Sequence, residues 1–206
     1  MEIIGISGNP GAGKTTLANS LFLEFNTRVI HLDHILDCVK EILPNNMFIS
    51  INRDTNENIK MLKRGNFYKK IKNNRYLLWA YLNSKWELSR MILNKMLYDF
   101  AKEDVDYVII EGYNLETIIS LDELDCSILV DAPLDLRLKR VCDRNHPKEI
   151  MIGGNAAYEE LADTSDLSKY DYYFINDCQD DKFYNRVMNL QLSIFNHKSY
   201  ARGKKL

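Results

Sequence analysis

The sequence predicts an α/β domain: a five-stranded parallel sheet covered by helices, with a mostly helical insertion between its second and third strands. Three observations lead to this prediction. Short apolar runs alternate with segments of helical periodicity, a glycine-rich loop joins the first run to the first helix, and one long interval contains no convincing strand. Strands buried on both faces of a parallel sheet give nearly continuous apolar runs, and helices between them imply right-handed crossovers.

The candidate strands are short runs rich in Ile, Val, Leu, Tyr or Phe. They are Glu2–Ser7, Arg28–Leu32, Asp106–Glu111, Cys126–Asp131 and Asp171–Ile175. Apolar residues spaced three and four apart predict amphipathic helices after the first, fourth and fifth strands. These helices are Lys14–Phe25, Leu134–Arg144 and Asp180–Phe195.

Residues 42–105 form the interval without a strand, and they read as an insertion into the core. Asn56–Arg64 has the pattern of a short helix and Tyr76–Lys102 that of a long one. We therefore expect a core of residues 1–41 and 106–196, a helical insertion at residues 42–105, and a flexible, solvated tail at residues 197–206.

The composition narrows the range of partners. The chain has 206 residues, 46% of them hydrophobic, and a formal net charge of −2. So small a net charge provides no overall field for nucleic acid or for an anionic membrane surface. No apolar run approaches the roughly 18 residues that span a bilayer, and the N-terminus has no signal-peptide pattern. The four cysteines form no CxxC pair, as expected for reduced thiols. We expect a soluble, cytoplasmic protein of undetermined oligomeric state.

Residues 8–15 read GNPGAGKT, a full match to the phosphate-binding pattern G-x-x-x-x-G-K-[ST] between a candidate strand and a candidate helix. Gly8, Gly11 and Gly13 allow the backbone to curl so that successive N–H groups face one anion. Lys14 supplies charge for the β- and γ-phosphates of ATP, and the Thr15 hydroxyl suits Mg²⁺. We expect ATP and Mg²⁺ as cofactors, and the residues expected to bind the nucleotide here are Gly8, Asn9, Pro10, Gly11, Ala12, Gly13, Lys14, Thr15 and Thr16.

Two acidic residues end strands at the edge of the sheet where open parallel sheets bind ligands. Asp33 follows the second strand, where a carboxylate can accept the proton of an attacking hydroxyl or help to hold Mg²⁺. Alternatively, it caps a helix that begins at His34. Glu111 ends the third strand and can reach Mg²⁺ through water, while Gly112 after it would leave clearance for a ligand.

Basic residues follow the fourth strand. Arg137, Arg140 and Arg144 are spaced three and four apart, so one helix face can carry all three. Arginines at this place can clamp the oxygens of a transferring phosphoryl group, and we assign Arg140 and Arg144 that catalytic role. The alternative is a solvated helix face. The segment at about residues 143–156 contains two adjacent glycines and is a candidate lid.

Two further clusters have simpler alternatives. Lysines and arginines between Lys60 and Arg75 would suit an acceptor that carries phosphate, but a solvated helical surface is the simpler interpretation. His31 and His34 flank Asp33, yet no third metal ligand accompanies them.

With these motifs, the chain resembles the P-loop nucleoside and nucleotide kinases, and dephospho-CoA kinases above all. The similarity lies in Ile4–Thr16, Val29–Asp33, the run VDAPLDLRLKRVCDR that ends at Arg144, and the run YYFIND that ends at Asp177. The resemblance implies a three-layer P-loop kinase fold, Asp33 as the base, and Arg140 and Arg144 as lid arginines. It also implies that Asn176 and Asp177 lie beside the adenine.

The chain departs from dephospho-CoA kinases at two places. It has SKWE at residues 84–87 where that family has a His-Pro element, and its third strand ends in Glu111-Gly112, which is similar to uridine and pantothenate kinases. The insertion, which would choose the acceptor, has no match.

The expected function is an ATP-dependent kinase that transfers the γ-phosphate to a hydroxyl of a small nucleotide- or nucleoside-like acceptor. Dephospho-CoA is one candidate acceptor. The alternatives are a kinase that acts on nucleic-acid ends or modified bases, and a P-loop ATPase that is not a kinase. A regulatory GTPase is disfavoured because the guanine motif N/T-K-x-D does not occur.

Overall fold

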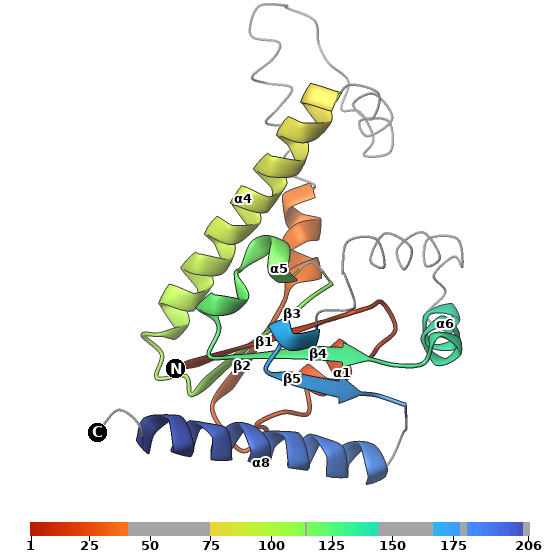
Figure 1. Ribbon diagram of the computed structural model, residues 1–206. Helices are drawn as coiled ribbons and strands as arrows, with labels where there is room; N and C mark the ends of the chain where they lie inside the picture. The colour runs from red at the N-terminus through yellow and green to blue at the C-terminus, as the bar shows by residue number, and fades with distance from the viewer. Residues whose placement is uncertain (41–74, 114, 144–166, 178–180, 204–206) are drawn as a thin grey trace, which may run out of the picture. The chain divides into compact units, whose positions relative to one another are not determined.

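The computed structural model describes residues 1–40, 75–113, 115–143, 167–177 and 181–203 (Figure 1). The chain divides into two compact units: Met1–Leu32 with Phe100–Leu206, and Asp33–Asp99. The first unit contains the sheet and the glycine-rich loop. The second unit contains nearly all of a helical segment at residues 32–40 and of helix α4 (Arg75–Phe100).

The first unit is built on a parallel sheet of five strands in the order β2-β3-β1-β4-β5. The strands are β1 (Glu2–Gly8), β2 (Thr27–His31), β3 (Tyr107–Glu111), β4 (Cys126–Asp131) and β5 (Tyr172–Ile175). All four pairings between neighbouring strands are parallel. The predicted α/β class and five-stranded parallel sheet are confirmed, and each strand begins and ends within one residue of its predicted bounds.

The register of the strands decides which residues share the carboxyl edge of the sheet. Glu111 of β3 is level with Ile6 of β1 and with His31 of β2. Gly8 of β1 is level with Val130 of β4. The glycine-rich loop, which follows Gly8, therefore leaves the sheet at the edge where Glu111 and His31 lie.

Different elements cover the two faces of the sheet. On one face, α1 (Lys14–Ala18) and α8 (Asp181–Gly203) pack on β1, β3, β4 and β5 in one core that includes Ile6, Leu17 and Val187. On the other face lie α5 (Leu115–Ile118) and the 3₁₀ turn η1 (Leu121–Glu123). This packing is close: a Cβ on Gly5 of β1 would lie 2.3 Å from the side chain of Leu124. Figure 1 shows α8 running along one side of the sheet.

Helix α1 is shorter than predicted. The sequence predicts a helix through Phe25, but α1 ends at Ala18 and turns follow to residue 25. Phe22 has a positive φ of 55°, which a continuing right-handed helix cannot contain. Its ring is fully buried and stacks on Tyr107 with centroids 4.2 Å apart. Burial of Phe22 therefore outweighs the helical periodicity of the segment.

The other helices differ from the predictions mainly at their ends. Helix α6 is Leu134–Cys142, and η2 (Leu167–Lys169) precedes β5. Helix α8 continues to Gly203, beyond the point at which a flexible tail is expected from residue 197. The predicted helix Asn56–Arg64 and residues 144–156 of the candidate lid lie outside the described residues.

Two properties of the described residues bear on the expected character of the protein. None of the described helices, including α4 and α8, is long and apolar enough to cross a membrane. Cys38 and Cys126 are free thiols. Burial, together with the nearby carboxylates of Asp171 and Asp125, raises the pKa of Cys126 to about 12, so this thiol stays protonated at neutral pH.

Candidate phosphate-binding site

The loop after β1 has the conformation that its glycines permit. Gly11 and Gly13 have φ of 79° and 96°, in the left-handed region that favours glycine. A Cβ at Gly13 would lie 2.0 Å from the Asn176 amide nitrogen, and one at Gly11 would lie 2.6 Å from the backbone oxygen of Arg137. The glycines therefore also let α6 and the end of β5 approach the loop from outside.

Lys14 is held by the loop that precedes it. Its Nζ donates a hydrogen bond to the carbonyl oxygen of Asn9 at 3.2 Å, and the side chain is almost fully buried. The same carbonyl accepts a bond from the backbone N–H of Ala12 at 3.1 Å. The ammonium group is thus fixed inside the curve of the loop.

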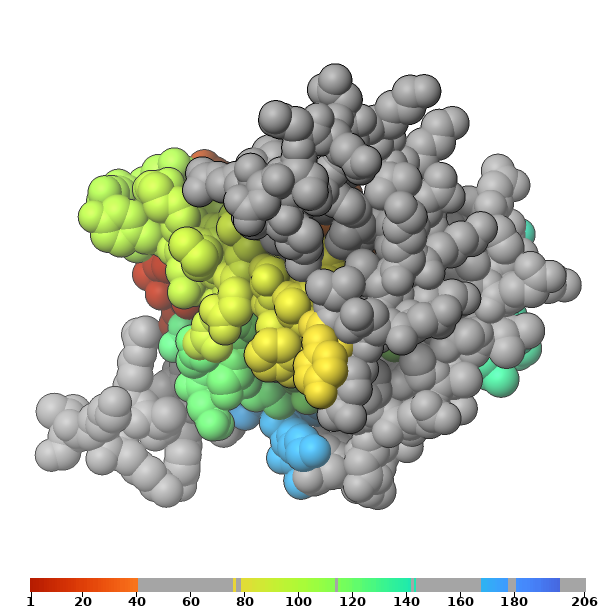
Figure 2. All heavy atoms as spheres, turned by 90° about the horizontal axis from the view of Figure 1, so that it is seen from above, coloured from red at the N-terminus to blue at the C-terminus, as the bar shows by residue number. Residues whose placement is uncertain are grey.

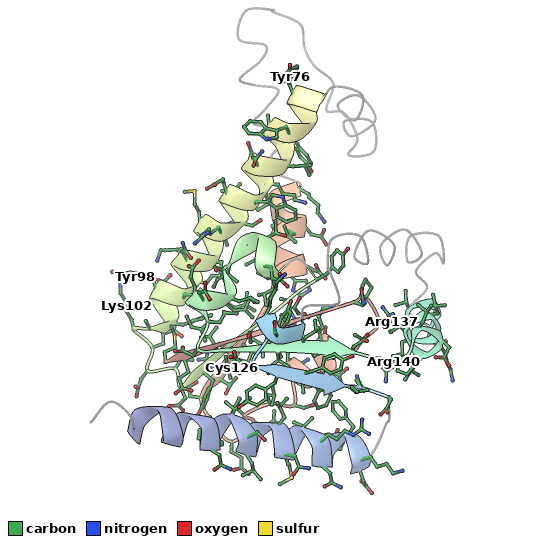
Figure 3. All side chains as sticks on the ribbon, viewed as in Figure 1. Tyr76, Tyr98, Lys102, Cys126, Arg137 and Arg140 are labelled. Carbon is green, nitrogen blue, oxygen red and sulfur yellow. The ribbon has the colours of Figure 1, made fainter. Side chains whose placement is uncertain are left out.

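Arg140 and Asn176 brace the loop from outside. The Arg140 guanidinium donates to the carbonyls of Gly11 (3.3 Å), Ala12 (3.4 Å) and Asn176 (3.2 Å). The buried amide of Asn176 donates to the carbonyl of Ala12 at 2.8 Å and accepts from Arg140 at 3.3 Å. This network links the loop to α6, which Figure 3 shows with Arg137 and Arg140, and to the end of β5.

Glu111 brings the end of β3 to the start of α1. Its carboxylate is buried, and the same oxygen, Oε1, accepts a hydrogen bond from the Thr15 hydroxyl at 3.2 Å and lies 2.7 Å from Nδ1 of His31. Thr15 and Glu111, the two residues of this unit that we predicted as metal ligands, are therefore in direct contact.

The remaining predicted site residues have different surroundings. Asp33 is exposed and opens the second unit. Pro10 is partly exposed and Thr16 is exposed. Asp177 accepts a 2.5 Å hydrogen bond from Arg186 of α8. Arg144 lies outside the described residues.

Several expectations need correction. The helical segment begins at residue 32, so Asp33 lies in its first turn and does not cap a helix that starts at His34. Gly112 has a second reason to lack a side chain, because an added Cβ would lie 2.8 Å from the Cβ of Leu32. Arg137 is buried, with its Nε 3.8 Å from Asp131, so it is no solvated face residue.

Sequence reasoning missed two relationships. His31 was considered only as a metal ligand, whereas the structure places it against Glu111; no cluster of three or more metal-ligating side chains occurs among the described residues. The pairing of β2 with β3 would have indicated this contact, because both residues end their strands. Asn176 and Ala12 are 164 positions apart, and no local pattern signals their bond.

The residues present fit a nucleotide phosphate and a hard cation. The curled loop, with Lys14 inside it, is a cradle suited to an anion. The Thr15 hydroxyl and the Glu111 carboxylate are oxygen ligands of the type that Mg²⁺ prefers. Asn9 also has a buried side-chain oxygen that accepts no hydrogen bond from the described residues.

No protein-family model matches the chain. The chain is 26% identical over 178 residues to a cytidylate kinase from Borreliella burgdorferi, an alignment that covers 79% of this chain and 76% of that protein.

Two solved structures share its fold. The crystal structure of TT1252 from Thermus thermophilus is similar with a TM-score of 0.71 and 20% identity, over 93% of this chain and 96% of the other. Dephospho-CoA kinase from Campylobacter jejuni is similar with a TM-score of 0.62 and 19% identity, over 95% and 98%. The chain therefore has the fold of a P-loop kinase.

Proposed function

We propose that this protein is an ATP-dependent kinase that transfers the γ-phosphate to a hydroxyl of a small acceptor. The observation that carries the proposal is the contact between Thr15 and Glu111 beside a complete phosphate-binding loop. It joins two side chains able to ligate Mg²⁺ to the place where the nucleotide phosphates would lie. The fold shared with a dephospho-CoA kinase supports the same reading.

Each residue of the loop region has a role in this proposal. The backbone of residues 8–13 and the ammonium of Lys14 bind the β- and γ-phosphates. Thr15 and Glu111 hold Mg²⁺, directly or through water. A bound Mg²⁺ would supply positive charge that stabilises the negative charge on the phosphoryl oxygens. Asn176 and Asp177 lie at the end of β5 and would face the adenine.

The transfer step requires a proton acceptor and a clamp for the moving charge. The acceptor's hydroxyl oxygen forms a bond to the γ-phosphorus as the bond from that phosphorus to the β–γ bridging oxygen breaks, and ADP leaves. The hydroxyl proton passes to the Asp33 carboxylate. Arg144 would contact the transferring phosphoryl group. Arg140 would act mainly through the loop, since four of its hydrogen bonds go to Gly11, Ala12 and Asn176.

We infer a nucleotide- or nucleoside-like acceptor, with dephospho-CoA among the candidates. The relative with 26% identity is a cytidylate kinase, and one structural neighbour is a dephospho-CoA kinase. Both of these enzymes are named for an acceptor that contains a nucleotide. The second unit, Asp33–Asp99, would bind it.

The experiment is an acceptor panel: nucleosides, nucleotides, dephospho-CoA and an oligonucleotide, each incubated with ATP and Mg²⁺ and analysed by mass spectrometry. We expect one small acceptor to gain a phosphoryl group as ADP forms. Phosphorylation of the oligonucleotide alone would favour a kinase acting on nucleic-acid ends. ADP and inorganic phosphate without any phosphorylated acceptor would indicate an ATPase and contradict the proposal.

A further inference from the structure

One side of helix α4 in the second unit leads from a half-buried lysine to two fully buried residues. Lys85, Ser89 and Leu93 are spaced four apart, so they follow one another along one side of the helix. Ser89 and Leu93 are fully buried, whereas Tyr76, Trp79 and Met91 elsewhere on the helix are largely exposed. Figure 2 shows exposed atoms of α4, in yellow to yellow-green, on the surface of the molecule. A half-buried lysine and a fully buried serine thus share one side of the helix.

Lys85 lies on this row, and no carboxylate of the described residues forms an ion pair with it. No Asp or Glu lies three or four residues from it on α4. Its Nζ lies 3.5 Å from the ring centroid of Trp86. Burial and the positive charge of Lys40 lower its pKa to about 8. Lys40 itself is 2.9 Å from Asp37.

Ser89, one turn after Lys85, adds a hydroxyl on the same side of the helix. Its oxygen is buried and makes no hydrogen bond to the described residues. Buried polar groups are normally satisfied, so an unsatisfied one calls for a ligand, an ion or water. A serine hydroxyl can donate to an anion that an adjacent ammonium attracts.

We propose that Lys85 and the Ser89 hydroxyl form a binding site for an anionic group, phosphate or carboxylate, on the molecule that receives the γ-phosphate. This inference rests on the proposed function, because it assigns the site to the kinase's acceptor. An anion there would balance the ammonium of Lys85 and give the Ser89 hydroxyl an acceptor. The acceptor is therefore a charged metabolite and not a neutral nucleoside.

The same helix provides a matched control. Lys95 is also a lysine of α4, but it is exposed and forms an ion pair with Asp99 four residues later. An anion attracted by the general charge of the helix would affect both lysines. An anion held at the proposed site would affect Lys85 alone.

The test measures the reactivity of each lysine by acetylation at pH 8, with the modified residues identified by mass spectrometry. The full chain is first saturated with ADP and Mg²⁺, so that the loop of the first unit does not compete for the probe. Inorganic phosphate and acetate are the probes, and they distinguish a phosphate-bearing acceptor from a carboxylate-bearing one. Bound phosphate should lower Lys85 acetylation about fivefold, the loss of neutral amine at pH 8 when a pKa of about 8 rises by about one unit. Lys95 should not change.

Equal acetylation of Lys85 with and without both probes would overturn the proposal, and so would equal protection of Lys95. A Ser89→Ala variant should retain an acetylatable Lys85 but lose most of its protection. Nucleotide binding is measured separately by calorimetry. A chain that binds no ADP would contradict the proposed kinase, whereas the acetylation pattern reports on the anion site by itself.

Discussion

At the phosphate-binding loop, the cationic side chains are held by backbone carbonyls: Lys14 by that of Asn9, and Arg140 by those of Gly11 and Ala12. On α4, Lys85 lies over an indole ring, and the residues that the structure describes offer neither an ion-pair partner for its ammonium nor a hydrogen-bond partner for the buried Ser89 hydroxyl. The first arrangement is built from backbone that a short motif specifies. The second is built from side chains that only the folded second unit brings together. An anion would complete both, but only the first is recognisable from a sequence pattern.

The largest effect should come from the loop. We expect Lys14→Ala to lower phosphotransfer on the order of 10³-fold or more, because the lysine neutralises charge that grows in the transition state. Steady-state rates and a thermal melt would be measured together. The matched control is Lys139→Ala, which removes an exposed lysine of α6. Retained activity in a folded Lys14→Ala protein would remove the loop from the proposed mechanism.

Asp33→Asn should lower turnover by on the order of 10²-fold and leave the affinity for ATP nearly unchanged, because the amide cannot accept the hydroxyl proton. Calorimetry with a non-hydrolysable ATP analogue supplies the affinity. Equal losses of turnover and affinity would mean that Asp33 acts as a metal ligand or in the structure of the helix.

His31→Ala should raise the Mg²⁺ concentration needed for half-maximal nucleotide binding about tenfold, since partners that orient a metal ligand typically have effects of this size. The reason is the 2.7 Å contact between His31 and the Glu111 oxygen that Thr15 also contacts. Nucleotide binding is measured by calorimetry over a Mg²⁺ series. His31→Gln retains a donor and should recover part of the loss; failure of both variants to change the Mg²⁺ requirement would leave His31 without a role there.

The smallest effect concerns stability. The pKa of Lys85 is about 8 in the folded chain and 10.5 for an ordinary lysine, so the unfolded chain binds more protons between these values. The free energy of unfolding should therefore rise with pH between about 8 and 10.5. Relative to Lys85→Gln, the rise should be on the order of 1 kcal/mol after allowance for solvent screening of a half-buried group. Urea denaturation across this pH range measures it, and phosphate should flatten the rise. A pH dependence identical in both proteins would contradict the lowered pKa.

The sheet was predictable because each strand is a short apolar run buried on both faces. The end of α1 was not, since the burial of Phe22 against Tyr107 depends on a residue 85 positions away in the chain. The curl of the loop follows from its glycines, and Gly13 has the positive φ that this curl requires.

The contacts around the loop could not be predicted because they depend on which strands are neighbours. His31 meets Glu111 because β2 pairs with β3, and Arg140 reaches Gly11 because α6 packs beside the loop. The sequence pattern also assigned Arg140 to transferring phosphate, without any signal of the carbonyls that it binds. Lys85 belongs to the insertion, for which the family resemblance offered no match. Its neighbours could not be predicted, because they come together only in the folded chain.

The most direct test of the two-site account is a kinetic comparison of Lys85→Gln with Lys95→Gln, with ATP and the acceptor varied in turn. We expect Lys85→Gln to raise the acceptor KM about tenfold, the equivalent of ~1.4 kcal/mol for one charge-assisted contact, and to leave the KM for ATP unchanged. Lys95→Gln should change neither value. A rise in the KM for ATP alone after Lys85→Gln would contradict the assignment of the two anions to two regions.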